Sequence, residues 1–123
     1  MTTSTTHTGV LIVESLRPEC TLTVPGMVVK GIHRFPTADP LTPVWTLLDI
    51  EVPDEQAASF AHQLESALTE GPWYADFGDA ETHTVVFPGR VFTYASADPE
   101  GRRPAHDHGL SIGVPEAQLD WGE

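Results

Sequence analysis

A histidine and a tyrosine in the second half of the chain are spaced so that they can face each other across a hairpin. Pro88-Gly89 separates two alternating segments. If the loop has two residues, His83 pairs directly with Tyr94 and both side chains share a face. Proline cannot take the positive φ of a type I′ turn, so this pairing requires a type II turn or a bulge, and a one-residue slip would break it. An imidazole beside a phenol in an apolar wall can orient a small ligand or transfer a proton. The same pair also fits an ordinary buried hydrogen bond.

Further polar and aromatic residues extend this candidate site. Alternation over residues 27–35 places His33 on the more apolar face of a strand. A burial-tuned histidine with a carboxylate nearby is sufficient for proton transfer. The candidate catalytic residues are therefore His33, His83 and Tyr94, and the candidate binding residues are Trp45, Phe92, Glu14 and Asp49.

No motif of a metal or cofactor enzyme is present. The chain lacks the G-x-S-x-G, H-E-x-x-H and C-x-x-C patterns, a phosphate loop and a dinucleotide fingerprint. His106-Asp107-His108 offers metal-binding residue types, but residues two apart on a helix point to different faces. We therefore expect no metal centre and no cofactor.

Hydrophobic periodicity predicts six strands and two helices. The first helix, over residues 54–69, begins at Asp54 as its cap and buries a stripe that includes Phe60 and Leu64. The second spans about 98–112, and its continuity is left open because Pro104 and Gly109 lie inside it. The predicted strands cover residues 10–16, 27–35, 44–52, 73–77, 82–87 and 90–95.

These elements predict an α+β fold, an antiparallel sheet of about six strands with two helices packed on one face. Apolar residues such as Trp45 and Leu47 then remain on the other face and need a different cover. We expect a homodimer formed through the sheet to supply it.

Composition limits the classes of function. The 123 residues suit one domain, which we expect over residues 8–121 after a disordered tail at 1–7. A formal charge of -12 repels phosphate, so no nucleic acid is expected as a partner. No run of about 20 apolar residues suggests a membrane span, and we expect a cytoplasmic protein.

Three stretches carry a resemblance. They are residues 71–77 (GPWYADF), 85–92 (VVFPGRVF) and 113–121 (GVPEAQLDW). Through them the chain resembles small uncharacterised proteins of similar length over most of residues 8–121, and this resemblance implies no activity. The order of strands and helices also resembles the broad ferredoxin-like group, which implies a fold rather than a function.

Two functions remain open. The first is a small non-enzymatic binding or accessory protein that dimerises through its sheet and recognises a small molecule or a protein partner. The alternative is a small-pocket enzyme of the isomerase, cyclase or dehydratase type, with a His/Tyr/carboxylate acid–base site. A strongly shifted histidine pKa in a solvent-reachable pocket would favour the enzyme.

Overall fold

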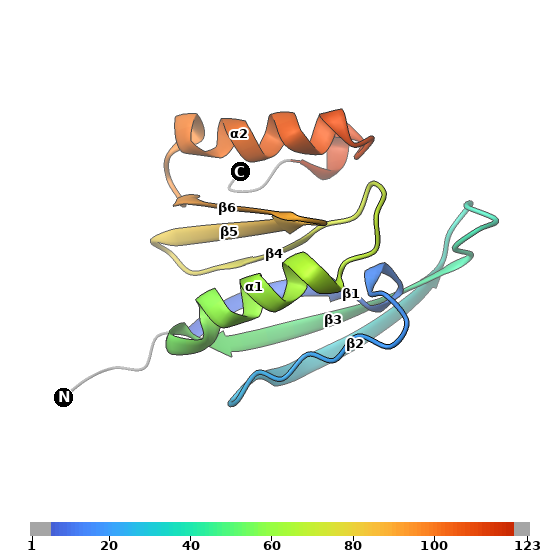
Figure 1. Cartoon of the computed structure of the whole chain (residues 1–123), viewed down its shortest axis with the longest axis horizontal. Helices are drawn as coiled ribbons and strands as arrows, with labels where there is room; N and C mark the ends of the chain where they lie inside the picture. The colour runs from blue at the N-terminus through green and yellow to red at the C-terminus, as the bar shows by residue number, and fades with distance from the viewer. Residues whose placement is uncertain (1–5, 120–123) are drawn as a thin grey trace.

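Six antiparallel strands form one sheet in the computed structural model, which describes residues 6–119 (Figure 1). Its strand order is β2-β3-β1-β4-β5-β6, and the order along the chain is three strands, a helix, three strands and a helix. This confirms the α+β class, while a ferredoxin-like arrangement is not confirmed. The elements are β1 (Thr6–Ile12), β2 (Val28–Pro36), β3 (Val44–Pro53), α1 (Ala57–Ala67), β4 (Ala75–Gly78), β5 (Thr82–Phe87), β6 (Arg90–Ala95) and α2 (Pro99–Ser111).

The two helices cover opposite faces of the sheet, so the expectation that both pack on one face is wrong. Val86 of β5 packs in the same core cluster as Phe60 and Leu64 of α1. Its neighbour Val85 packs instead with Ala105 of α2. Adjacent strand residues point to opposite faces, so each helix has its own core. Figure 1 shows α1 in front of the sheet and α2 beside β6.

The hairpin between β5 and β6 has the predicted register. Phe87 pairs with Arg90, and His83 pairs with Tyr94. Gly89 has a φ of 78°, the left-handed conformation that the second central residue of a type II turn requires. The pairing of the imidazole with the phenol is therefore confirmed.

A bulge in β2 changes which of its residues share a face. Val29 pairs with Ile50 and Gly31 pairs with Asp49, so Lys30 is the extra residue. Strict alternation over residues 27–35 is therefore wrong. Val29 lies on the α1 face with Ile50, whereas Gly31 and His33, which pair with Asp49 and Leu47, lie on the other face.

The two helices begin differently. Asp98 caps α2, since its Oδ1 accepts the Glu100 N–H at 3.1 Å, and the helix continues through Pro104. Asp54 does not cap α1. A single 3-10 turn, Asp54–Gln56, precedes that helix, and the Asp54 carboxylate binds His7 instead.

The chain enters the sheet earlier than expected. Thr6 and His7 already pair with Pro53 and Val52. β1 therefore spans Thr6–Ile12 instead of the expected residues 10–16. The predicted tail at 1–7 is therefore wrong at its last two residues, because backbone pairing and the burial of His7 hold them. Residues 1–5 lie outside the described part, as does Trp121 at the other end. Leu119 is buried.

Each helix covers only part of its face. α1 packs mainly over β5 and the neighbouring strands, whereas α2 packs over β6. The face opposite α1 is therefore open over β2 and β3, where Trp45 and Leu47 are half-buried. Among residues 6–119, no helix is both long enough and apolar enough to cross a bilayer.

Candidate functional site

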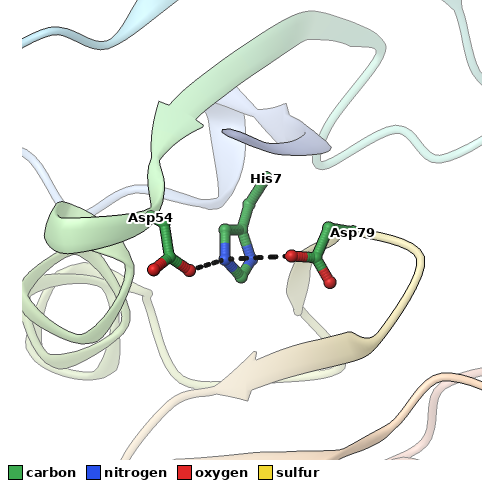
Figure 2. Close-up of side chains that lie close together, drawn as sticks. All are labelled: His7, Asp54 and Asp79. Carbon is green, nitrogen blue, oxygen red and sulfur yellow. Dashed lines mark hydrogen bonds and ion pairs between the residues drawn. The ribbon is translucent and has the colours of Figure 1, made fainter. Parts of the chain in front are cut away.

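A buried histidine and two aspartates meet at one end of the sheet. His7 comes from the start of β1, Asp54 follows β3, and Asp79 lies in the turn between β4 and β5. The His7 Nε2 atom is 2.8 Å from Asp54 Oδ1 and 3.8 Å from Asp79 Oδ2. Figure 2 shows the imidazole ring between the two carboxylates. We refer to these three residues as the His7 cluster.

His7 is the interior member of this cluster. The residue is 4% exposed, and its ring meets Phe77 edge-on at 6.1 Å between centroids. Strand parity explains the burial, because His7 and Leu11 point to the α1 face. Among the residues that the structure describes, Nδ1 of His7 has no hydrogen-bond partner. One ring nitrogen is thus held by Asp54 and the other is unpartnered.

Asp79 is fixed by the turn that carries it. Its Oδ1 accepts the backbone N–H groups of Thr82 at 2.8 Å and Glu81 at 2.9 Å. These hydrogen bonds, with the nearby His7, lower the pKa of Asp79, while burial opposes them. Asp79 is therefore a carboxylate at neutral pH, and its Oδ2 is the oxygen that lies nearest the His7 ring.

The His7 cluster opens into a groove of about 640 Å³ on the α1 face. Alanines of α1 form one wall, and threonines of β5 and β6 form the floor. His7 and Asp54 lie at the end of the groove where α1 begins. We call this the α1–β6 groove. The residues that line it are His7, Asp54, Ala57, Ala58, Ala61, His62, Glu65, Thr82, Thr84, Gly89, Arg90, Val91 and Thr93.

The predicted His83–Tyr94 pair lies on the other face, under α2. The ring centroids are 5.6 Å apart, and His83 Nε2 is 3.1 Å from Asp76 Oδ2. That contact is a close ion pair without the alignment of a hydrogen bond. Burial, with a smaller contribution from Asp76, raises the pKa of Tyr94 to about 12, although Arg102 opposes it. Neither His83 nor Tyr94 lines the α1–β6 groove.

His33 does not join that pair, so a site that combines His33 with His83 is not formed. Four strand-to-strand steps separate β2 from β5, which corresponds to roughly 19 Å. The His33 side chain is 63% exposed, and its Nε2 is 3.0 Å from Asp49 Oδ2. Trp45 lies on the same open face between Phe35 and Trp73.

The remaining predicted site residues hold local structure. Both carboxylate oxygens of Glu14 bind Thr46, from its N–H at 2.6 Å and its hydroxyl at 2.8 Å. Burial alone would raise the pKa of Glu14, but these hydrogen bonds and Arg34 outweigh it and the pKa is lowered. Phe92 packs on Phe87 and His108 beneath α2. Neither residue lines the α1–β6 groove.

The His7 cluster differs from the site expected from the sequence. His7 lies among threonines and was expected in a tail, and Asp54 was expected as a helix cap. The available signal was the alternation of Thr6-His7-Thr8 into Val10 and Leu11, which extends the first strand back by four residues. The convergence of Asp79 with the other two depends on long-range pairing, and nothing local in the sequence signals it.

Comparisons of the chain with protein-family models, with curated proteins and with solved structures give no match.

Proposed function

We propose that this protein is a small binding protein that takes a small polar molecule into the α1–β6 groove. The observation that supports this most directly is the groove itself, with a volume of about 640 Å³. Ligand sites in proteins commonly measure roughly 300–1,000 Å³. The groove lies between a helix and a sheet that a shared core holds in place, so its walls are formed before a ligand arrives.

The lining favours a ligand that donates hydrogen bonds. Hydroxyl groups of Thr82, Thr84 and Thr93 lie along the floor, and the carboxylates of Asp54 and Glu65 lie at the edges. Hydroxyls and carboxylates both accept hydrogen bonds from amines and alcohols. The alanine wall adds apolar contact for a short carbon chain.

Charge favours the same class of ligand. Arg90 lies at the groove, but its guanidinium stacks over the Phe92 ring, 4.9 Å from the centroid. Arg90 and Phe92 are two residues apart on β6, so both side chains belong to the α2 face. The carboxylates therefore dominate the potential in the groove. We propose amines and polyols as ligands rather than phosphates or carboxylates.

Amide NMR titration with two four-carbon probes tests this proposal. We expect 1,4-diaminobutane to shift the amide signals of Ala57, Ala58, Thr84 and Thr93, and succinate to leave them unmoved. Glycerol represents the polyols, and we expect it to shift the same amide signals as the diamine. Shifts by succinate as large as those by the diamine, or shifts confined to residues outside the groove, would contradict the proposal.

A pair of tryptophan variants supplies the control. Ala58 is exposed on the groove wall, so Ala58→Trp fills the groove with little effect on the core. Ala38 is equally exposed in the loop between β2 and β3, away from the groove. We expect Ala58→Trp to abolish the diamine shifts and Ala38→Trp to preserve them.

One observation favours an enzyme as the second candidate. The hydrogen bond that His7 Nε2–H donates to Asp54 orients the imidazole at the end of the groove, as a carboxylate orients the imidazole of a general base. The acid–base residues would then be His7 and Asp54, in place of His33, His83 and Tyr94. Chemical conversion of a bound probe that is lost in Asp54→Asn, while binding persists, would favour this candidate.

We also propose that the protein forms a homodimer through the open face of β2 and β3. Phe35, Trp45 and Trp73 form an aromatic band there, and Phe35 is 42% exposed. On this face the ammonium group of Lys30 lies 3.8 Å from a carboxylate oxygen of Glu51 and offsets part of the negative charge. A second copy could therefore approach despite the overall charge of -12. We propose the cytoplasm as the compartment, where the lone Cys20 would remain a thiol.

A further inference from the structure

We infer that the His7 cluster is a binding site for one divalent transition-metal ion, held by His7 Nε2, Asp54 and Asp79 Oδ2. This inference does not rest on the organic ligand proposed for the α1–β6 groove, since an ion can bind at the end of the groove whether or not a molecule fills the remainder.

The donor atoms are already close to a metal geometry. One ligand atom from each residue lies within 4.8 Å of the other two. Bonds of about 2.0–2.1 Å in a tetrahedral site place ligand atoms about 3.3–3.4 Å apart. The two distances from His7 Nε2, 2.8 Å to Asp54 and 3.8 Å to Asp79, lie on either side of that value. Relative to His7 Nε2, a shift of about half an ångström brings each carboxylate oxygen to that spacing. The two carboxylate oxygens lie within 4.8 Å of each other and would approach by up to about 1.4 Å around an ion.

Within the His7 cluster, the Oδ2 atom of Asp79 forms no hydrogen bond with the His7 ring. A single Nε2–H donates to Asp54 at 2.8 Å, and Asp79 Oδ2 at 3.8 Å is beyond hydrogen-bond reach of the same nitrogen. Figure 2 shows both carboxylates directed at the imidazole from opposite sides. A cation among the three residues would contact both carboxylates at once, which one proton cannot do.

The ring can change tautomer to accept the ion. Binding at Nε2 requires a lone pair there, so the proton must move to Nδ1. Nδ1 is buried in a residue that is 4% exposed, and no group among residues 6–119 donates a hydrogen bond to it. The hydrogen bond from Nε2–H to Asp54 is given up in this change, and the bonds that the metal forms to Nε2 and to that carboxylate replace it. The imidazole remains neutral, and the released Nε2 lone pair forms the bond to the metal.

The two carboxylates differ in how firmly the fold holds them. Asp79 uses Oδ1 for the turn and keeps Oδ2 for the ion, so it is a pre-positioned ligand. Asp54 is 62% exposed and can adjust its position. Three protein ligands leave at least one coordination position open toward the groove, as in metal sites that also bind water or a small molecule. One imidazole and two carboxylates suit Zn²⁺ and Mn²⁺.

Calorimetric titration of the full, tag-free chain with Zn²⁺ tests this inference. We expect one ion per chain, and affinities at least tenfold weaker in Asp54→Asn and Asp79→Asn. Asparagine at position 79 keeps the Oδ1 acceptor of the turn, so amide spectra should show that this variant folds. The matched control is Asp76→Asn. Asp76 also faces a histidine, His83 at 3.1 Å, but it lies on the opposite face and we expect less than a twofold change.

Mn²⁺ locates the ion. We expect paramagnetic broadening centred on the amides of residues 7, 54 and 79. Broadening centred on residues 106–108, equal Zn²⁺ affinity in all four proteins, or no Zn²⁺ binding at millimolar concentration would overturn the inference. The Ala58→Trp variant separates the two proposals, because it should lose the diamine shifts and keep the Zn²⁺ site.

Discussion

The two tyrosines of the chain show how differently buried hydroxyl groups can be treated within one fold. The hydroxyl of Tyr74 donates to the backbone carbonyl of Gln118 at 2.8 Å. The hydroxyl of Tyr94 is buried and has no partner in the described part of the chain. A buried hydroxyl without a partner loses its hydration and receives nothing in return. Tyr94 thus stabilises the fold through its ring rather than through its oxygen.

We therefore expect opposite results from two phenylalanine variants. Tyr74→Phe should lower the free energy of unfolding by about 1 kcal/mol, because a hydrogen bond is lost and the Gln118 carbonyl loses its donor. Tyr94→Phe should leave the stability unchanged or raise it by up to about 1 kcal/mol. Urea denaturation measures both. A Tyr94→Phe variant as unstable as Tyr74→Phe would show that the Tyr94 hydroxyl has a partner.

The Tyr94 hydroxyl also determines behaviour at alkaline pH. Burial raises its pKa from 10.0 to about 12, so the folded chain holds this proton over a range in which the unfolded chain releases it. This contribution to stability is complete below pH 10 and is lost as the pH rises toward 12. In Tyr74→Phe, the remaining tyrosinate absorbance should therefore rise near pH 12 or together with unfolding.

At the residue scale, a contact between two strand residues across a short turn could be predicted from the sequence, whereas the His7 cluster could not. The His83–Tyr94 contact could be predicted because a short turn determines it locally. The His7 cluster could not, because its members come from positions 7, 54 and 79 and meet only when β1 lies between β3 and β4.

At the scale of elements, the pairing of β1 with β4 joins the two halves of the sheet. Gly9 sits opposite Phe77 in this pairing. A Cβ atom at Gly9 would lie 2.6 Å from the Phe77 Cβ and would collide with the Asp76 carbonyl oxygen. Phe77 is fully buried, and Asp76 belongs to the backbone ladder, so neither can move aside easily. The absence of a side chain at Gly9 is thus required by the close approach of two strands.

We expect Gly9→Ala to destabilise the protein by about 3 kcal/mol, the upper range for overpacking. Thr8→Ala is the control, because Thr8 is exposed on the opposite face and its loss should cost under about 1 kcal/mol. Thermal and chemical denaturation measure both variants. Equal stability of the two would indicate that β1 and β4 can separate slightly at no cost.

The element boundaries that could be predicted are those with local chemical signals. Asp98-Pro99 determines the start of α2, and Pro88-Gly89 determines the hairpin. The face of the sheet that α2 covers is not determined by residues within the helix. Its signal was the unbroken run Val85-Val86-Phe87, because a strand that is apolar at consecutive positions is covered on both faces. The bulge at Lys30 has no comparable local signal, and it changes the face on which the preceding residues Val28 and Val29 lie relative to the rest of β2.

At the scale of the whole molecule, the sheet is covered diagonally. One helix lies over part of one face, and the other helix lies over a different part of the opposite face. Two uncovered areas result. One is the α1–β6 groove, and the other is the aromatic band on β2 and β3.

Light scattering at about 50 μM tests the proposed dimer. We expect the mass of a dimer for the wild-type chain and that of a monomer for Phe35→Glu, because a charge would then lie in the aromatic band. Leu41→Glu is the control. Leu41 is 91% exposed in the loop between β2 and β3, so this variant should remain dimeric. If the wild-type chain has the mass of a monomer at this concentration, the proposed homodimer is wrong.

The position of the His7 cluster has a consequence for how the molecule opens. His7 and Asp54 belong to the first three strands and their following turn, whereas Asp79 and Thr82 belong to the last three. Only three residue pairs join β1 to β4. An ion or molecule bound to residues on both sides would stabilise the pairing of β1 with β4. It would slow hydrogen exchange of the β1 and β4 amides more than that of other amides in the sheet.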